Sequence, residues 1–196
     1  AALYATLASV GLIPHHMLAT YQRGILGGHP PRAPELGIEA STGSLGQGLP
    51  IAVGLALAAK HDSRRSHVYV IVSDGECQEG TTWEALVMAS RFKLNNLTII
   101  VDDNGLQAFD RTQDIMTVPL ARLCAAAGCS VHHVDGHDHA ALLTALTATP
   151  TAATSRVIIA KTVKGKGLSF AQDKLEWHYR SLKPDQYEQA KQELAS

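Results

Sequence analysis

The stretch HVYVIVSDGECQEGTTWEA, residues 67–85, decides the fold. Its apolar first part, HVYVIV, predicts a buried strand at 67–72. The strand ends in the turn dipeptide Asp-Gly, and the residues after the turn predict a helix over 80–93. A strand followed by a tight turn and a helix is typical of the βαβ unit of a parallel sheet.

The remainder of the chain repeats this alternation. Further strands are predicted at 97–102, 130–134 and 156–161. Further helices are predicted at 1–11, 14–23, 45–60, 117–127, 138–148 and 184–194. We therefore predict an α/β fold in a single domain over residues 1–196, with a parallel sheet that carries helices on both faces.

Composition excludes several classes of function. Hydrophobic residues make up 45% of the chain and charged residues 18%, which is typical of a folded globule. The net charge of -1 gives no basic surface for nucleic acid or for an acidic membrane, and the longest mostly apolar run, 49–59, is too short to span a bilayer. Cys77, Cys124 and Cys129 cannot form a closed disulfide set and match no zinc spacing. We expect a reduced, cytoplasmic protein.

Two of the predicted strands end in acidic turns that contain glycine, SDGE at 73–76 and DDNGLQ at 102–107. In open α/β sheets, ligands bind at the carboxyl ends of neighbouring strands. Asp74 and Asn104 supply side-chain oxygens there, which suit a hard divalent cation such as Mg²⁺ and its phosphate ligands. The glycine in each turn lets the backbone approach a ligand closely.

Two other interpretations remain open from the residues alone. Asp-Gly and Asn-Gly are also ordinary turn dipeptides that bind no ligand. The spacing of Gly43, Gly46 and Gly48 suggests a nucleotide-binding loop, but no strand ends directly before it, as the dinucleotide fingerprint requires. The residues alone therefore predict an α/β domain that binds a phosphorylated ligand, with or without a metal.

Several sequence blocks carry a more specific resemblance. In chain order they are GGHPPRAPELGIEASTGSLGQGL at 27–49, SDGECQEGTTWEA at 73–85, LNNLTIIVDDNGLQ at 94–107, VDGHD at 134–138, AKTVKGKGLSF at 160–170 and EWH at 176–178. Together they resemble the thiamine diphosphate-binding domain of transketolase over nearly the whole chain. They resemble in particular the amino-terminal subunit of transketolases that are split over two chains, because no pyrimidine-binding domain follows the KGKG segment.

The resemblance implies a metal site at the two acidic turns. The side chains of Asp74 and Asn104 and the carbonyl of Leu106 would hold Mg²⁺ or Ca²⁺, which bridges the two phosphates of thiamine diphosphate. The backbone amides of Gly75 and Glu76 would face the diphosphate, as at a helix N-terminus.

The resemblance also implies the remaining cofactor contacts. His29 matches a catalytic histidine that faces the thiazolium and the hydroxyls of the substrate. Gly43 and Leu45 belong to a turn against the aminopyrimidine. His178 matches a histidine that reaches the diphosphate, and Lys164 would add a cationic contact there, although a solvated Lys164 is an open alternative.

A partner chain is part of the same expectation. The activating glutamate of the family lies on the pyrimidine-binding domain, so the resemblance implies a second subunit that carries it. Glu79 matches an acidic residue at the subunit contact, where it helps to couple paired active sites. The implied activity is transfer of a two-carbon ketol unit from a ketose or ketose phosphate to an aldose or aldose phosphate, by a heterotetramer of the two subunits.

The sequence departs from the family at two places. Ser73 stands where the family usually has glycine, and two family histidines upstream of the first residue have no counterpart, so we expect part of a longer subunit. Two alternatives stay open: a relative such as deoxyxylulose phosphate synthase, which shares the Asp…Asn motif, and a catalytically silent binding subunit. The joint presence of Asp74, Asn104 and His29 favours an enzyme.

Overall fold

The computed structural model describes residues 1–148 and 154–195. Its internal contacts divide the chain into two compact units, Ala1–Gln47 and Gly48–Ser196. The sequence predicts one domain and does not predict this division. The boundary lies in the Gly-rich run that leads directly into a helix, without the long polar linker that usually marks a domain boundary.

The larger unit is built on a parallel sheet. Its strands are β1 (Val68–Ser73), β2 (Leu97–Asp103), β3 (Ser130–Asp135) and β4 (Arg156–Lys161). They pair in the order β1-β2-β4-β3, and every neighbouring pair is parallel. The predicted α/β fold with a parallel sheet is confirmed, and each predicted strand lies within one residue of the observed one.

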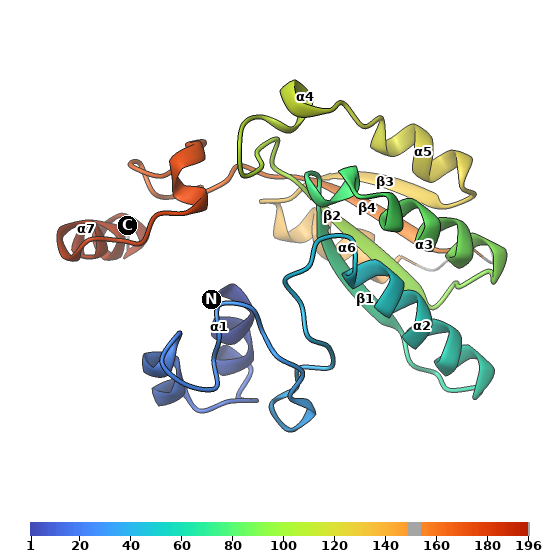
Figure 1. The fold of residues 1–196 in the computed structure, drawn as a ribbon, viewed down its shortest axis with the longest axis horizontal. Helices are drawn as coiled ribbons and strands as arrows, with labels where there is room; N and C mark the ends of the chain where they lie inside the picture. Colours follow the sequence, from blue (N-terminus) through green and yellow to red (C-terminus); the bar gives the residue numbers. More distant parts are fainter. Residues whose placement is uncertain (149–153, 196) are drawn as a thin grey trace. The chain divides into compact units, whose positions relative to one another are not determined.

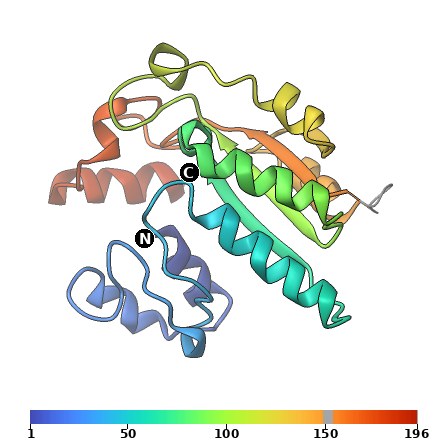
Figure 2. The ribbon, with the colours of Figure 1, turned by 45° about the vertical axis from the view of Figure 1, so that its right-hand side comes forward.

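Helices cover the sheet as the alternation predicts. Helices α2 (Gly48–His61), α3 (Gly80–Arg91) and α5 (Leu120–Ala126) pack on one face, and α6 (His139–Thr147) lies behind β3 on the other (Figure 1). Figure 2 shows α2 and α3 running side by side across the sheet.

Helix α2 shows how the sequence directs this packing. Its buried side chains recur at helical spacing on one stripe, and they are Leu49, Ala52, Val53, Ala56 and Ala59. The small residues in this stripe let the helix axis lie close to the sheet. The opposite side of α2 keeps Ile51 and Leu55 exposed, at 38% and 46%.

The second face of the sheet is open over the edge strand β1. Alternate residues of β1 point to opposite faces, and Tyr69 and Ile71 are 55% and 71% exposed. Apolar side chains with this exposure on an edge strand are typical of a surface that another element covers.

Short elements follow the strand ends. They are the 3₁₀ helix η3 (Glu76–Gln78), the single-turn α4 (Thr112–Ile115) and the 3₁₀ helix η4 (Leu175–His178). The chain then enters α7 (Pro184–Ala195), which is close to the helix predicted at 184–194. The Glu193 carboxylate of α7 accepts hydrogen bonds from the backbone and hydroxyl of Ser169, at 2.8 and 2.5 Å.

The smaller unit has its own apolar core. Helix α1 (Ala2–Ser9) and the 3₁₀ helices η1 (His15–Thr20) and η2 (Pro34–Leu36) enclose buried side chains that include Tyr4, Ile13 and Leu26. The Tyr4 hydroxyl donates a hydrogen bond to the carbonyl of Gly27 at 2.9 Å. The helix predicted at 14–23 is a shorter 3₁₀ helix, His15–Thr20, with i→i+3 bonds at its ends from the Met17 amide to Pro14 and from the Tyr21 amide to Leu18.

The three cysteines are free and buried in the core of the larger unit. Burial raises the pKa of Cys77 to about 12, of Cys124 to about 11 and of Cys129 to about 12. Cys124 lies in the last turn of α5 and Cys129 just beyond its end. In the described part of the chain, every helix is too short or too polar to cross a bilayer.

Candidate functional site

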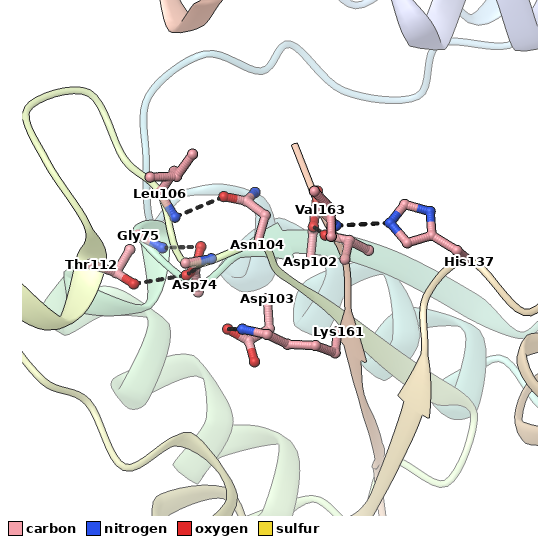
Figure 3. Close-up of polar contacts among 12 residues, drawn as sticks. Asp74, Gly75, Asp102, Asp103, Asn104, Leu106, Thr112, His137, Lys161 and Val163 are labelled. Carbon is pink, nitrogen blue, oxygen red and sulfur yellow. Dashed lines mark hydrogen bonds and ion pairs between the residues drawn. The ribbon is translucent and has the colours of Figure 1, made fainter. Parts of the chain in front are cut away.

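The candidate site lies at the carboxyl edge of the sheet. The strand register aligns Ser73 with Asp102 and Asp103 with Lys161, and Asp135 also pairs with Lys161. The loops that follow all four strands therefore begin at the same edge. Figure 3 shows the polar contacts among residues of these loops.

Asp74 is the centre of these contacts. Its carboxylate is buried, with the residue 5% exposed. One oxygen accepts from the backbone amide of Gly75 at 3.0 Å. The other accepts from the amide of Gly105 and the hydroxyl of Thr112, each at 2.9 Å (Figure 3). One side chain thus connects the turn after β1, the turn after β2 and α4.

In the described part of the chain, hydrogen bonds rather than a basic side chain stabilise the Asp74 carboxylate. Burial raises the pKa of Asp74 above its ordinary value, the nearby carboxylate of Asp103 adds to the rise, and the three hydrogen bonds oppose it. Among the residues that the structure describes, no basic side chain forms an ion pair with Asp74. The ionised form therefore costs free energy in this fold, and a bound cation would remove that cost.

Asn104 and Leu106 lie on the neighbouring turn. The Asn104 side-chain oxygen accepts from the Leu106 amide at 2.9 Å, and Gly105 between them has a positive φ of 75°. This left-handed residue reverses the chain, so that it passes back beside Asp74. No cluster of three or more His, Cys, Asp or Glu side chains with metal-binding geometry occurs in residues 1–148 and 154–195. Carboxylate, amide and carbonyl oxygens remain as the donor set, which fits a hard cation such as Mg²⁺.

The backbone amides predicted to face a diphosphate have local partners in this structure. The Gly75 amide donates to Asp74, and the Glu76 amide donates to the Ser73 hydroxyl at 3.0 Å. Ser73, where the family usually has glycine, thus supports the turn. A side chain at Gly75 would meet the Cβ of Gln107 at 3.0 Å, which explains the glycine. Contact of these amides with a diphosphate stays a prediction.

The structure brings Lys164 and His178 together. The Lys164 ammonium lies 3.3 Å from Nδ1 of His178. Burial lowers the pKa of His178, and the charge of Lys164 lowers it further, so the imidazole is held in its neutral form. The two groups present an ammonium and an imidazole on one short stretch of surface, which is a suitable pair for a phosphate.

An ion pair joins this region to the loop after β2. Arg111 contacts Asp173 at 3.1 Å, and the Asp173 amide donates to the carbonyl of Lys164 at 2.8 Å. A cleft of about 820 Å³ opens beside these residues, and its lining includes Asp74 and Asn104. The volume is in the range of small-molecule sites.

Three of the predicted site residues, His29, Gly43 and Leu45, lie in the smaller unit. Gly43 has a φ of 134°, and a Cβ built on it would lie 2.6 Å from Nδ1 of His29. His29 and Gly43, both predicted from the sequence to belong to one cofactor site, are thus in direct contact. Leu45 is 56% exposed.

Gly43→Ala is expected to destabilise the smaller unit and to displace the His29 ring. The new Cβ would overlap the ring, and the positive φ is strained for any L side chain, so we expect a loss of about 1–3 kcal/mol. Gly54→Ala on α2 is the matched control, because open space surrounds that position and alanine should there add about 0.5–1 kcal/mol of stability. Urea unfolding measures both, and an unchanged Gly43→Ala variant would contradict the described contact.

Glu79 occupies the N-cap position of α3 and is exposed. The position leaves its carboxylate accessible to another chain. Its role in coupling subunits stays a prediction.

Sequence reasoning missed Thr112 and the Arg111–Asp173 ion pair. Thr112 reaches Asp74 because the chain folds back after Leu106, where Leu106 and Arg111 form a bridge and the Gln107 amide donates to the Asp110 carbonyl. Asp110, a turn-favouring residue in this loop, is the one local signal for the reversal. No local pattern indicates the ion pair with Asp173, since the two residues are distant in the sequence.

The fold and the site define a class: an α/β domain with an oxygen-rich site for a hard cation and its phosphate ligand at the carboxyl ends of parallel strands. Comparisons with known proteins give the particular family. The family model for the thiamine diphosphate-binding domain of transketolase matches residues 20–196. The chain belongs to the transketolase family and contains its thiamine diphosphate-binding domain.

Individual relatives agree with this assignment. One of them is a subunit of the apulose-4-phosphate transketolase of Actinobacillus succinogenes, which is 43% identical over 194 residues that cover 97% of this chain and 70% of that protein. Another is the SqwG subunit of the 6-deoxy-6-sulfo-D-fructose transketolase of a Clostridium species. It is 37% identical over 197 residues, covering 98% of this chain and 72% of that protein.

Solved structures give the same result. Transketolase from Campylobacter jejuni superposes with a TM-score of 0.81 at 30% identity, over 86% of this chain. The chain spans only 28% of the length of that transketolase. The family of transferases and its cofactor, thiamine diphosphate, are thus shown, and a divalent metal is typical of the family.

Proposed function

We propose that this chain is the amino-terminal subunit of a split transketolase. It would move a two-carbon ketol unit from a ketose or its phosphate to an aldose or its phosphate, together with a partner chain that carries the pyrimidine-binding domain. The observation that carries the proposal is the buried carboxylate of Asp74 beside the Asn104 turn, because a buried anion next to further oxygen ligands suits a hard cation. The names of the relatives, which are transketolase subunits, support it.

The residues of this chain fit the cofactor. Asp74, Asn104 and the Leu106 carbonyl would hold Mg²⁺ or Ca²⁺, and Lys164 with His178 would contact the diphosphate. Gly75 and Glu76 would add backbone amides. Thiamine diphosphate supplies the carbon nucleophile of the transfer when it is bound.

His29 would act at the reacting end of the cofactor. His29, buttressed by Gly43, would donate a hydrogen bond to the substrate oxygen on which negative charge develops. Gly43 and Leu45 would lie against the aminopyrimidine. The chain's own residues therefore bind and orient, while the activating carboxylate is expected from the partner.

Exposed apolar surface supports a partner. Ile51 and Leu55 on the outer side of α2 and Val87 and Met88 on α3 are between 38% and 59% exposed. These two helices lie side by side, so their outer sides can form one continuous surface (Figure 2). We propose that this surface and Glu79 contact a second subunit in a cytoplasmic heterotetramer.

The partner requirement is a testable prediction. The purified chain alone should show no ketol transfer, and mixing it with its candidate pyrimidine-domain partner should give activity and the mass of a heterotetramer by light scattering. A partner variant in which the activating glutamate is changed to glutamine is the control, since it should assemble without activity. Robust transfer by the isolated chain would overturn the split-enzyme proposal.

The same assay separates the remaining alternatives. Product analysis with a panel of donors, including apulose 4-phosphate and 6-deoxy-6-sulfofructose from the names of the relatives, would identify the sugar. Condensation that depends on pyruvate would indicate a deoxyxylulose phosphate synthase instead. An assembly that binds cofactor and transfers nothing would indicate a silent binding subunit.

A further inference from the structure

The motif VDGHD, residues 134–138, lies directly against the end of β4. The Gly136 amide donates to the carbonyl of Lys161 at 2.8 Å. A Cβ on Gly136 would lie 2.4 Å from Cγ2 of Thr162 and 3.1 Å from the Lys161 carbonyl oxygen. Only glycine allows the turn after β3 to approach this closely.

This approach places the His137 side chain on the segment after β4. Its Nε2 accepts a hydrogen bond from the Val163 amide at 2.8 Å (Figure 3). The bond requires Nε2 to be unprotonated, so the imidazole is neutral with its hydrogen on Nδ1. The His137 amide in turn donates to the Asp135 carboxylate at 2.8 Å, which fixes the backbone that carries the ring.

The hydrogen bond from the Val163 amide to His137 lies just beyond the end of β4, where the chain leaves the sheet. The Thr162 amide still donates to the carbonyl of Asp103 on β2, at 3.2 Å, and the Thr162 hydroxyl contacts Asp102. The next amide, that of Val163, is held by the His137 ring. Lys164 follows immediately, and its ammonium contacts His178. His137 is thus one of the groups that fix the backbone beside Lys164, together with the Asp173 amide, which donates to the Lys164 carbonyl.

We propose that His137 is a positioning residue for diphosphate binding. It acts through the Val163 amide and fixes the place of Lys164 and, with it, of His178. The inference rests on the proposed function, in which these two groups contact the diphosphate. It assigns a role to the VDGHD motif, which supplies the glycine for close approach and the ring nitrogen for the hydrogen bond.

Two substitutions separate the hydrogen bond from the volume of the side chain. His137→Gln keeps an acceptor oxygen near the position of Nε2, and His137→Leu keeps an apolar side chain without an acceptor. His139→Leu is the control, since His139 is an exposed histidine at the start of α6. Each variant is made in the full chain and measured alone and in the complex with the partner.

The first measurement is hydrogen exchange of the Val163 amide by NMR in the chain alone. We expect exchange about fivefold faster in His137→Leu and near the parent rate in His137→Gln, because one net hydrogen bond is worth about 1 kcal/mol. The Val157 amide within β4 serves as the internal reference, since a general loss of stability would accelerate both. Unchanged exchange of Val163 in His137→Leu would overturn the proposal.

The second measurement is calorimetry of thiamine diphosphate with Mg²⁺ in the complex. His137→Leu should bind about fivefold to tenfold more weakly, and His137→Gln and His139→Leu should stay within about twofold of the parent. Faster Val163 exchange with unchanged affinity would also overturn the proposal, because the contact would then serve the fold alone. If the parent complex binds no thiamine diphosphate, the proposed function itself fails, and the positioning role of His137 fails with it. The exchange measurement still tests the hydrogen bond between Val163 and His137 in that case.

Discussion

Asp74→Ala is expected to reduce the affinity of the complex for thiamine diphosphate and Mg²⁺ by at least about 100-fold, or roughly 2.7 kcal/mol. The substitution removes the anionic ligand proposed for the cation. It also releases the Gly105 amide and the Thr112 hydroxyl, so the turn after β2 loses its connection to the turn after β1. Isothermal titration calorimetry with the partner present measures the affinity.

Two further variants make the result specific. Asp74→Asn keeps the size of the side chain and removes its charge, so it should lose most of the affinity; because its amide nitrogen replaces one accepting oxygen, it should also lower the thermal unfolding temperature. Asp62→Ala is the surface control. Asp62 pairs with Arg64 in the loop between α2 and β1, before the amino end of β1, whereas the site lies at the carboxyl ends of the strands. Parent-like affinity in both Asp74 variants would remove Asp74 from the metal site.

His29→Ala is expected to lower kcat by about 100-fold, the cost of removing one preorganised donor to developing charge. Cofactor affinity should change by less than about twofold, since the proposed contact strengthens in the transition state rather than in the ground state. Steady-state kinetics on a ketose that the parent accepts, together with calorimetry, gives both quantities.

His16→Ala is the matched control in the same unit, because His16 is an exposed histidine in η1. It should leave kcat and affinity unchanged. Equal kcat of the parent and of His29→Ala would exclude His29 from the reaction. A fall in cofactor affinity as large as the fall in kcat would instead assign His29 to binding.

The sequence predicted most of the larger unit because its signals are local. The ends of apolar runs such as 97–102 can be predicted from the sequence, since a polar turn follows each of them. The same turns located Asp74 and Asn104, because the carboxyl ends of adjacent parallel strands must lie together. The structure bears out their proximity through the bond from the Gly105 amide to Asp74.

What the sequence could not predict depends on the approach of distant segments. The bond from Val163 to His137 exists only because β3 and β4 are neighbours in the sheet. The sequence of neither strand indicates that order. The position of Thr112 depends in the same way on a loop that returns to Asp74. The division at Gln47 was missed because it depends on the density of contacts across the chain and not on composition.

The buried cysteines make the protein suited to site-specific labelling. Burial raises the pKa of these thiols to about 11 and 12, so the thiolate, which is the form that alkylating probes attack, is scarce near neutral pH. A single cysteine introduced at an exposed position would therefore react selectively without removal of the native ones. One such label in Ala1–Gln47 and a second in the sheet-containing unit would report the separation of the two units by fluorescence energy transfer as the cofactor and the partner are added.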